Sequence, residues 1–329
     1  MTPELNLVFS GTPAFAVPTL EALIWAGFKV SLVITQPDRP RGRGLEPAAS
    51  PVKQAAARLT LDIRQPEKIK TNQELRSDLE KLAPDAIIVV GYGRIIPPWM
   101  LELPRHGNIN LHASLLPKYR GAAPIQWAIA SGEKVTGVTT MRIDEGLDTG
   151  DILLQSEEAI AGEDTAETLS PRLAARGADL MLRTLEGLER GAIEPHPQDS
   201  RQASLAPLLK KEDGRIDFTR SAQEIHNRLR GFQPWPGAFT SFRGKTLHVV
   251  SAKPRPRRIP EAELHLEGTE LLVGCGMDTS LELVALQPEG KKPMSAKDFI
   301  HGYRPQSGER FGQLPSLPSS APKTSGTSF

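Results

Sequence analysis

The sequence predicts an α/β fold, with a Rossmann-like, doubly wound and mostly parallel sheet followed by a small domain that resembles a β-barrel. Strand-like and helix-like runs alternate from residue 5 to residue 188, whereas short strands between turn residues dominate after residue 208. A polar stretch with prolines, 194–207, separates the two patterns. We therefore expect a first domain at 1–193, a linker at 194–207 and a second domain at 208–312.

Four short runs in the first half are predicted as strands because they are mostly apolar on both faces and rich in β-branched residues. They are 5–9, 28–35, 85–90 and 108–112. Helix start and stop signals lie between and after them. The expected helices are 13–26 before Gly27, one that begins at Ser50-Pro51, 75–82 after a capping box at Thr71-Asn-Gln-Glu74, and 167–188.

The second half is predicted to be mainly β-structure. One short helix, 221–229, comes first, and the expected strands are 238–243, 246–251, 270–274 and 280–286. The last stretch, 313–329, is rich in Ser, Pro and Thr and has no acidic residue. Such a composition cannot bury enough apolar surface to order itself, so we expect a disordered tail.

Composition points to an ordinary globular protein of 329 residues, with 39% hydrophobic and 24% charged residues. The one cysteine, Cys275, cannot form an internal disulfide, and this fits a reducing compartment. No run reaches the roughly 20 apolar residues needed to span a bilayer. We expect a cytoplasmic monomer that binds no membrane and no metal.

Charge is unevenly distributed, although the formal net charge is only +1. Residues 1–207 carry 22 Lys and Arg against 26 Asp and Glu, while 208–312 carry 17 against 13. A basic second half suits a polyanionic partner, but a difference of this size is also common by chance.

The turn Ser10-Gly-Thr-Pro13 after the first strand invites comparison with a dinucleotide-binding site. That fingerprint needs three spaced glycines, and here Pro13 and Phe15 occupy the region where the backbone must approach phosphate. Asp38 stands where a ribose ligand would be expected. Without the glycines, we expect a Rossmann-like sheet that does not bind NAD.

The candidate chemistry lies in the run Asn108-Ile-Asn-Leu-His-Ala-Ser-Leu-Leu-Pro117 and in Gly146-Leu-Asp-Thr-Gly150. Along a strand, Asn110 and His112 project from the same face. An amide N–H can donate to a developing oxyanion, an imidazole can exchange a proton, and a carboxylate such as Asp148 can orient the imidazole. Taken singly, each residue is more often structural, and Gly-x-Asp-x-Gly alone is usually a turn.

Together these motifs resemble those of the folate-dependent formyltransferases, which combine Asn-x-His, Ser-Leu-Leu-Pro and a later Asp. The resemblance implies catalytic roles for Asn110, His112 and Asp148. It implies 10-formyltetrahydrofolate as a co-substrate, with no tightly bound cofactor. Seven residues would then form its pocket: Ser114, Leu115, Leu116 and Pro117 in the turn, and Val90, Gly91 and Tyr92 at a strand end.

A narrower resemblance, covering nearly residues 5 to 312, is to the methionyl-tRNA formyltransferases. The loop Thr35-Gln-Pro-Asp-Arg-Pro-Arg-Gly-Arg-Gly44 is similar to a loop that in this family lies beside the tRNA acceptor end, although Leu45-Glu46 replaces the usual lysines. Gln233-Pro-Trp-Pro-Gly237 is similar to the family's C-terminal barrel, and the resemblance implies that the second domain is a small OB-like β-barrel. The expected tRNA contacts are Arg39, Arg41 and Arg43 in the loop and Lys210, Lys211, Lys291 and Lys292 in the barrel. From the residues alone, a solvated surface loop is the better explanation of this segment.

The resemblance therefore implies formyl transfer from 10-formyltetrahydrofolate to the α-amine of initiator methionyl-tRNA. Two alternatives stay open. A formyltransferase acting on an amino-sugar nucleotide would carry a similar Asn-x-His, Asp and barrel, but the arginine loop argues against it. A tRNA-binding module with a decayed site would not keep all three catalytic residue types.

Overall fold

The computed structural model describes residues 5–41 and 46–312, and it divides the chain into two compact units. Unit 1 comprises Met1–Ile129 and Glu133–Leu208, and unit 2 comprises Ala130–Gly132 and Leu209–Phe329. Arg43 and the predicted tail, 313–329, lie outside the described residues.

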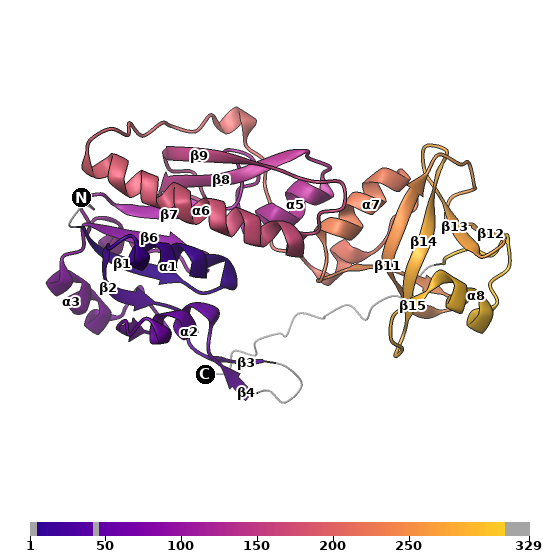
Figure 1. Cartoon of the computed structure of the whole chain (residues 1–329), viewed down its shortest axis with the longest axis horizontal. Helices are drawn as coiled ribbons and strands as arrows, with labels where there is room; N and C mark the ends of the chain where they lie inside the picture. The colour runs from indigo at the N-terminus through magenta and orange to yellow at the C-terminus, as the bar shows by residue number, and fades with distance from the viewer. Residues whose placement is uncertain (1–4, 42–45, 313–329) are drawn as a thin grey trace, which may run out of the picture. The chain divides into compact units, whose positions relative to one another are not determined.

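Unit 1 is built on a seven-stranded sheet with the order β5-β2-β1-β6-β7-β8-β9 (Figure 1). The first five strands of this order run parallel to their neighbours, and the last two are antiparallel. The order reverses between β1 and β6, which makes the sheet doubly wound. The strands are Asn6–Gly11, Lys29–Ile34, Ile63–Arg64, Ala86–Val90, Asn108–His112, Val135–Arg142 and Ile152–Ala159, for β1, β2, β5, β6, β7, β8 and β9.

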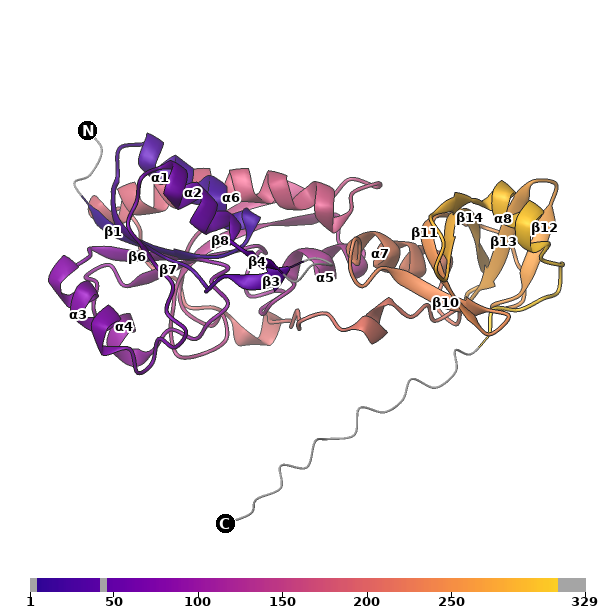
Figure 2. The same ribbon diagram turned by 90° about the horizontal axis from the view of Figure 1, so that it is seen from below.

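Helices cover both faces of this sheet. Helices α1, α2 and α6 lie on one face, and α3 and α4 lie on the other (Figure 2). In the described chain, no helix is both long and apolar enough to cross a bilayer. The helices are α1 Val17–Trp25, α2 Pro51–Arg58, α3 Gln73–Leu82, α4 Pro98–Leu101, α5 Pro124–Ala130 and α6 Ala166–Glu189.

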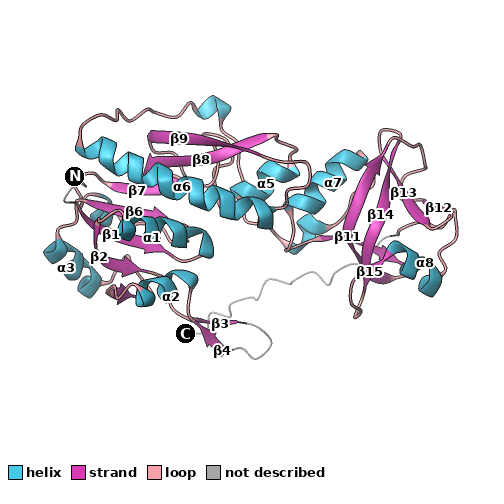
Figure 3. Cartoon of the chain, in the orientation of Figure 1, coloured by secondary structure: helices cyan, strands magenta, loops and turns pink. Residues whose placement is uncertain are grey.

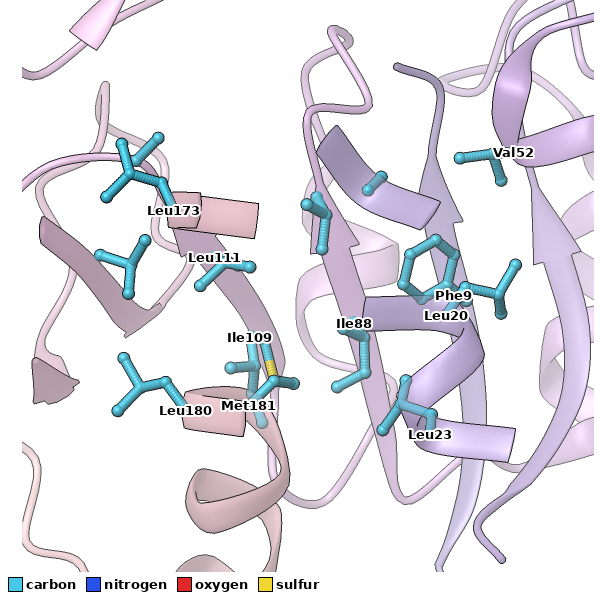
Figure 4. Close-up of a cluster of buried hydrophobic side chains, with 14 of the residues drawn as sticks. Phe9, Leu20, Leu23, Val52, Ile88, Ile109, Leu111, Leu173, Leu180 and Met181 are labelled. Carbon is cyan, nitrogen blue, oxygen red and sulfur yellow. The ribbon is translucent and has the colours of Figure 1, made fainter. Parts of the chain in front are cut away.

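The main core of unit 1 lies between the sheet and α1, α2 and α6. Phe9 of β1, Ile88 of β6 and Leu111 of β7 point into it and meet side chains such as Leu20 of α1 and Met181 of α6 (Figure 4). All five are at most 3% exposed. The strand that carries the candidate catalytic residues is thus anchored by its apolar face.

Several predicted helix starts are confirmed by their capping contacts. The Ser50 and Ser221 hydroxyls accept from backbone N–H groups of Lys53 and Glu224, as an N-cap requires. The capping box at Thr71 is wrong: the N-cap is Asn72, whose side chain accepts from the Leu75 N–H. Both residue types cap well, so the sequence pattern alone did not separate them.

Two strands of unit 1, β8 and β9, were not predicted. Central residues of β8 are buried threonines, including Thr136, Thr139 and Thr140, which do not give the apolar run expected of a buried strand. Strand β9 is exposed at every second residue near its end because it forms an edge. Their antiparallel pairing, Thr140 with Leu154 for example, places the Gly146–Gly150 turn beyond their ends.

Unit 2 is a curved antiparallel sheet with the order β10-β11-β14-β13-β12, and β15 pairs with β14 (Figure 3). Segment 308–312 lies between the two ends of this order: Gly312 bridges Ser241 of β10, and Arg310 bridges Glu263 beside β12. These bridges close the sheet into a barrel, whose interior is one apolar core. Its elements are α7 Ala222–Gly231, β10 Ala238–Phe242, β11 Lys245–Arg255, β12 Leu264–Glu267, β13 Glu270–Cys275, β14 Thr279–Pro288, β15 Met294–Ser295 and α8 Ala296–Tyr303.

The stretch expected to be a linker is hydrogen-bonded to unit 1. We call residues 196–207 the strap. His196 pairs with Ile152 through two backbone hydrogen bonds, of 2.8 and 2.9 Å. At its other end, Pro207 accepts at 2.8 Å from the indole N–H of Trp127. The strap therefore belongs to the packed structure around the candidate site.

The start of α6 provides a pH-dependent contribution to stability. Asp164 accepts from both terminal nitrogens of Arg172, at 2.8 and 2.9 Å, and this pairing lowers its pKa to about 2. The stabilisation is complete well above the unfolded pKa, near about 3.9, and is lost as the pH falls through the folded value.

We expect Asp164→Asn to lower the free energy of unfolding at pH 6 by about 1–2 kcal/mol, a deficit that narrows by roughly half at pH 3. Urea unfolding at both pH values measures this. Asp179→Asn is the control, since Asp179 is exposed on the same helix and has no ion pair within the described chain. An equal deficit at the two pH values would contradict the prediction.

Candidate active site

Strand β7 presents its polar face away from the main core. Ile109 and Leu111 are buried in that core, while Asn108, Asn110 and His112 alternate with them and project from the opposite face. Asn108 is buried and donates at 2.8 Å to the carbonyl of Met100. Asn110 is only half-buried, and its side chain makes no hydrogen bond within the described chain. Its amide is therefore available to a substrate oxygen.

The imidazole of His112 is held in one orientation by the backbone. Its Nε2 lies 2.9 Å from the carbonyl oxygen of Tyr119, and the ring is 6% exposed. A carbonyl can only accept, so Nε2 carries a hydrogen and donates it. Nδ1 lies 3.6 Å from Oδ2 of Asp148, beyond hydrogen-bond distance. Nδ1 is thus the ring nitrogen left to exchange a proton.

The carboxylate of Asp148 is also held by the backbone. Its Oδ2 accepts from the backbone N–H of Gly121 at 2.8 Å. Asp148 has φ of +51°, a left-handed conformation that costs a non-glycine residue on the order of 1 kcal/mol. The turn around it is braced from within by Asp144, which accepts from the Gly146 N–H and the Thr149 hydroxyl.

The Ser-Leu-Leu-Pro turn is shaped by its own hydrogen bonds. Ser114 is fully buried and donates at 2.6 Å to the Lys118 carbonyl, and Leu116 is 3% exposed. These two residues therefore form the turn, whereas Leu115 and Pro117 are partly exposed beside it. A pocket wall made by this turn would consist of Leu115, Pro117 and backbone atoms.

At the end of β6, the structure differs from the predicted pocket wall. Val90 lies in the main core, and the Tyr92 side chain is 1% exposed within the smaller core against α3 and α4. Burial raises the pKa of the Tyr92 phenol to about 12. The Tyr92 carbonyl also accepts from Gln36 at 2.8 Å. Of the three predicted residues, only Gly91 is exposed, so this edge can offer backbone but not these side chains.

The turn after β1 is filled by a proline ring. A Cβ placed on Gly91 would lie 2.8 Å from Cγ of Pro13, so the two segments are in tight contact. Asp38, the other feature of a dinucleotide site, is bound by Lys53 at 2.6 Å and by Gln65 at 2.8 Å. The hydrogen bond from Lys53 lowers the pKa of Asp38. Asp38 therefore anchors the base of the arginine loop.

Of the residues predicted to contact tRNA, Arg39 and the four lysines are exposed. Arg39 is exposed and begins β3, Arg39–Arg41, which pairs with β4, Glu46–Ala48, in a short hairpin. The backbone of Arg41 is described, and Arg43 falls outside the described residues. The four lysines of unit 2 that are predicted to contact tRNA are exposed, and none of them has a carboxylate within 4.0 Å in the described chain: Lys210, Lys211, Lys291 and Lys292.

Backbone groups and Gln198 of the strap complete the site, and their contacts were not predicted from the sequence. The Tyr119 carbonyl orients His112, a role that was predicted for Asp148. The Gly121 N–H binds the Asp148 carboxylate. Gln198 of the strap binds the carbonyls of Asp148 and Gly150. A contact made by a backbone group does not depend on residue type, so the sequence does not reveal it. Gln198 is 50 residues from Asp148, too far for a local pattern to connect them.

The arrangement can catalyse acyl transfer. An amide donor, an imidazole with a free nitrogen and a carboxylate gather at the carboxyl end of a parallel strand, where ligands bind in sheets of this kind. Fold and site together define an acyl-transfer enzyme built on a Rossmann-like sheet.

Comparison with known proteins gives the family. Residues 5–185 match the formyl transferase family, and residues 208–304 match the formyl transferase C-terminal domain. The methionyl-tRNA formyltransferase of Koribacter versatilis is 64% identical over 310 residues, which cover 94% of this chain and 99% of that protein. That of Acidobacterium capsulatum is 61% identical over 91% of this chain and 96% of that protein. The chain therefore belongs to the methionyl-tRNA formyltransferase family.

Solved structures share the fold. An N-formyltransferase from Helicobacter canadensis, in complex with folinic acid and dTDP-3-aminofucose, aligns with a TM-score of 0.64 at 20% identity and covers 86% of this chain and 99% of its own. WlaRD, a sugar 3N-formyl transferase, also gives 0.64, at 19% identity, and covers 88% and 100%. The predicted fold class is confirmed.

We expect Asn110→Ala to lower kcat by about 10²- to 10³-fold, as removal of an oxyanion-hole donor commonly does. His112→Ala and Asp148→Ala should each have a large effect, and the double variant should be little slower than either because the two act as a unit. Single-turnover formyl transfer measures these rates, and circular dichroism checks the fold. Near-normal turnover in any single variant would remove that residue from the mechanism.

Proposed function

We propose that this chain transfers the formyl group of 10-formyltetrahydrofolate to the α-amino group of methionyl-initiator tRNA, giving N-formylmethionyl-tRNA for translation initiation. The observation that carries the proposal is the set of Asn110, His112 and Asp148, brought together at the end of β7 in a chain of this family. Formylation of charged initiator tRNA, with 10-formyltetrahydrofolate as the donor, is the direct test.

The reaction makes one C–N bond and breaks another. The neutral α-amine attacks the formyl carbon, and the carbonyl oxygen becomes an oxyanion. The bond from that carbon to N10 of the folate then breaks, the amine loses a proton and N10 gains one. No covalent enzyme intermediate is required, and Cys275 lies buried in the core of unit 2.

The site residues have distinct roles in this scheme. Asn110 donates its free amide N–H to the oxyanion. His112 keeps its Nε2 hydrogen on Tyr119, and its Nδ1, once it has taken a proton, donates to the oxyanion or carries that proton toward N10. Asp148 faces Nδ1 with Oδ2 at 3.6 Å and orients the imidazole, while its other oxygen, Oδ1, would orient an ordered water.

The folate is a co-substrate and not a tightly bound cofactor in this proposal. It enters beside the Ser114–Pro117 turn, with Leu115, Pro117 and the exposed Gly91 near its ring system. The solved relative from Helicobacter canadensis was crystallised with folinic acid, a folate.

The tRNA contacts come from both units. Arg39, Arg41 and Arg43 would bind backbone phosphates near the acceptor end, because guanidinium groups bind phosphate well and stack on bases. In unit 2, Lys210, Lys211, Lys291 and Lys292 would add sequence-independent attraction. The protein acts as a cytoplasmic monomer in this proposal.

An amino-sugar nucleotide is the alternative acceptor, since the Helicobacter canadensis enzyme binds one. Its 20% identity shows the fold alone, whereas relatives at 45–64% identity are methionyl-tRNA formyltransferases. A side-by-side assay with charged initiator tRNA and a nucleotide-linked amino sugar separates the two. Transfer to the sugar alone would overturn the proposal.

Activity should rise from pH 6 toward mildly alkaline pH. The attacking amine must be neutral, and an α-amino group titrates near about 7.7–8.0, lower beside an electron-withdrawing ester. The pH profile of single-turnover formyl transfer measures this. A flat profile with chemistry shown to be rate-limiting would contradict amine attack as the controlled step.

Recognition of tRNA should be separable from folate binding. Arg39→Ala and Arg43→Ala are expected to lower kcat/KM for methionyl-tRNA while the folate Kd stays unchanged. Replacing Lys291 and Lys292 together should weaken tRNA binding and reduce the slope of log affinity against log salt by about 0.9 for each phosphate that is no longer bound. Lys81→Ala on α3 is the control. Equal losses of folate binding and formylation in the arginine variants would assign the loop to the pocket.

A further inference from the structure

The strap grips the turn that carries Asp148. The side-chain amide of Gln198 donates to two carbonyls of that turn, at 2.9 Å to Asp148 and at 2.7 Å to Gly150. These carbonyls lie on either side of Thr149, so one amide group fixes the backbone just after the catalytic carboxylate. The turn needs such support, because Asp148 holds a left-handed conformation that a non-glycine residue disfavours.

A buried arginine fixes which way the Gln198 amide faces. Arg120 donates to Oε1 of Gln198 through Nε at 3.1 Å and Nη2 at 2.7 Å. A guanidinium has only donors, so the amide oxygen must face Arg120 and the NH₂ group must face the two carbonyls. All four hydrogen bonds are satisfied in this orientation, and a flipped amide would make none of them.

Arg120 is unusual because it is a buried cation without an ion pair in the described chain. It is 7% exposed, and no carboxylate within the described chain lies within 4.0 Å of its guanidinium. Burying a charge without an ion pair is costly, and a purely structural contact to Gln198 would not need a cation. This cost is explained if Arg120 holds Oε1 of Gln198 in place near the catalytic residues.

The same short segment touches both members of the catalytic pair. Tyr119 accepts from His112, and Gly121 donates to Asp148, directly on either side of Arg120. The strap in turn holds the backbone of Arg120 through Ser204 and Ala206, at 2.8 and 2.7 Å. The Arg120 side chain therefore connects the segment that orients His112 to the turn that presents Asp148.

We propose that Arg120 and Gln198 are positioning residues for formyl transfer: the guanidinium sets the orientation of the Gln198 amide, and the amide holds the Asp148 turn so that its carboxylate stays beside Nδ1 of His112. This inference rests on the proposed function for its activity readout. Neither residue touches the reacting atoms in this proposal.

The most informative variant is Gln198→Glu, which keeps the shape of the side chain. One carboxylate oxygen would still accept from Arg120, with added ionic attraction, so the strap stays attached. The other oxygen would face the carbonyls of Asp148 and Gly150, and three acceptors would repel one another. The control is Gln73→Glu, which adds the same charge to unit 1 at an exposed position at the start of α3, away from the strap.

We expect Gln198→Glu to lower single-turnover formyl transfer by about 10- to 100-fold, and Gln73→Glu to leave it within about 2-fold. In an Asp148→Asn background the Gln198→Glu change should have almost no further effect, because the group it positions is already gone. Arg120→Met should resemble Gln198→Glu, and Arg120→Lys should restore part of the rate because one donor remains.

A spectroscopic measurement separates this inference from the proposed function. In protein labelled with ¹⁵N-histidine, the ring signals of His112, assigned with His112→Gln, should move in Gln198→Glu and Arg120→Met and stay in place in Gln73→Glu. This readout needs no substrate. If the wild-type protein fails to formylate methionyl-tRNA but the signals move as stated, the positioning role stands and the acceptor is wrong. Unmoved signals, or an equal rate loss with and without Asp148, would overturn the positioning role.

Discussion

The site depends on one geometric constraint, the 3.6 Å separation between Nδ1 of His112 and Oδ2 of Asp148. The two residues come from different strand ends, 36 positions apart, and no direct hydrogen bond joins them. Their spacing is set by backbone groups of 119–121, which bind the imidazole with a carbonyl and the carboxylate with an N–H. Gly121 is required in that segment: its φ is +121°, and a Cβ there would lie 2.7 Å from the Ala206 carbonyl oxygen.

The fold supplies this constraint by combining two kinds of strand pairing. The parallel strands bring the end of β7 to the edge where ligands bind. The antiparallel strand β8 runs back along β7 and ends beside Ile109, and the connection to β9, residues 143–151, then carries Asp148 to within 3.6 Å of His112. The apolar face of β7, through Ile109 and Leu111, ties the whole arrangement to α6. A parallel pairing of β8 with β9 would need a crossover connection of a dozen or more residues in place of this segment.

The sequence predicted the parts of the molecule in which periodicity and residue type carry the information. The apolar strands at 85–90 and 108–112 and the amphipathic helix at 167–188 are confirmed, because burial itself produced their patterns. Strands β8 and β9 were missed because buried threonines and an exposed edge conceal the apolar run. The pairing of Asn110 with His112 on one face followed from alternation along a strand. The Tyr119 carbonyl and the strap did not, because backbone groups and long-range contacts have no residue-level pattern.

The strap also explains how a stretch with the composition of a linker can take part in a site. Its prolines and polar residues suit a chain that forms no regular element, yet its backbone donors and acceptors are used along its length, from His196 to Pro207. Because these contacts are with unit 1, the chain leaves that unit only after the site has been completed. The polar composition that predicted a linker instead provides the Gln198 amide that holds the Asp148 turn. Support for the turn that carries the carboxylate therefore comes from the segment that separates the two domains in sequence.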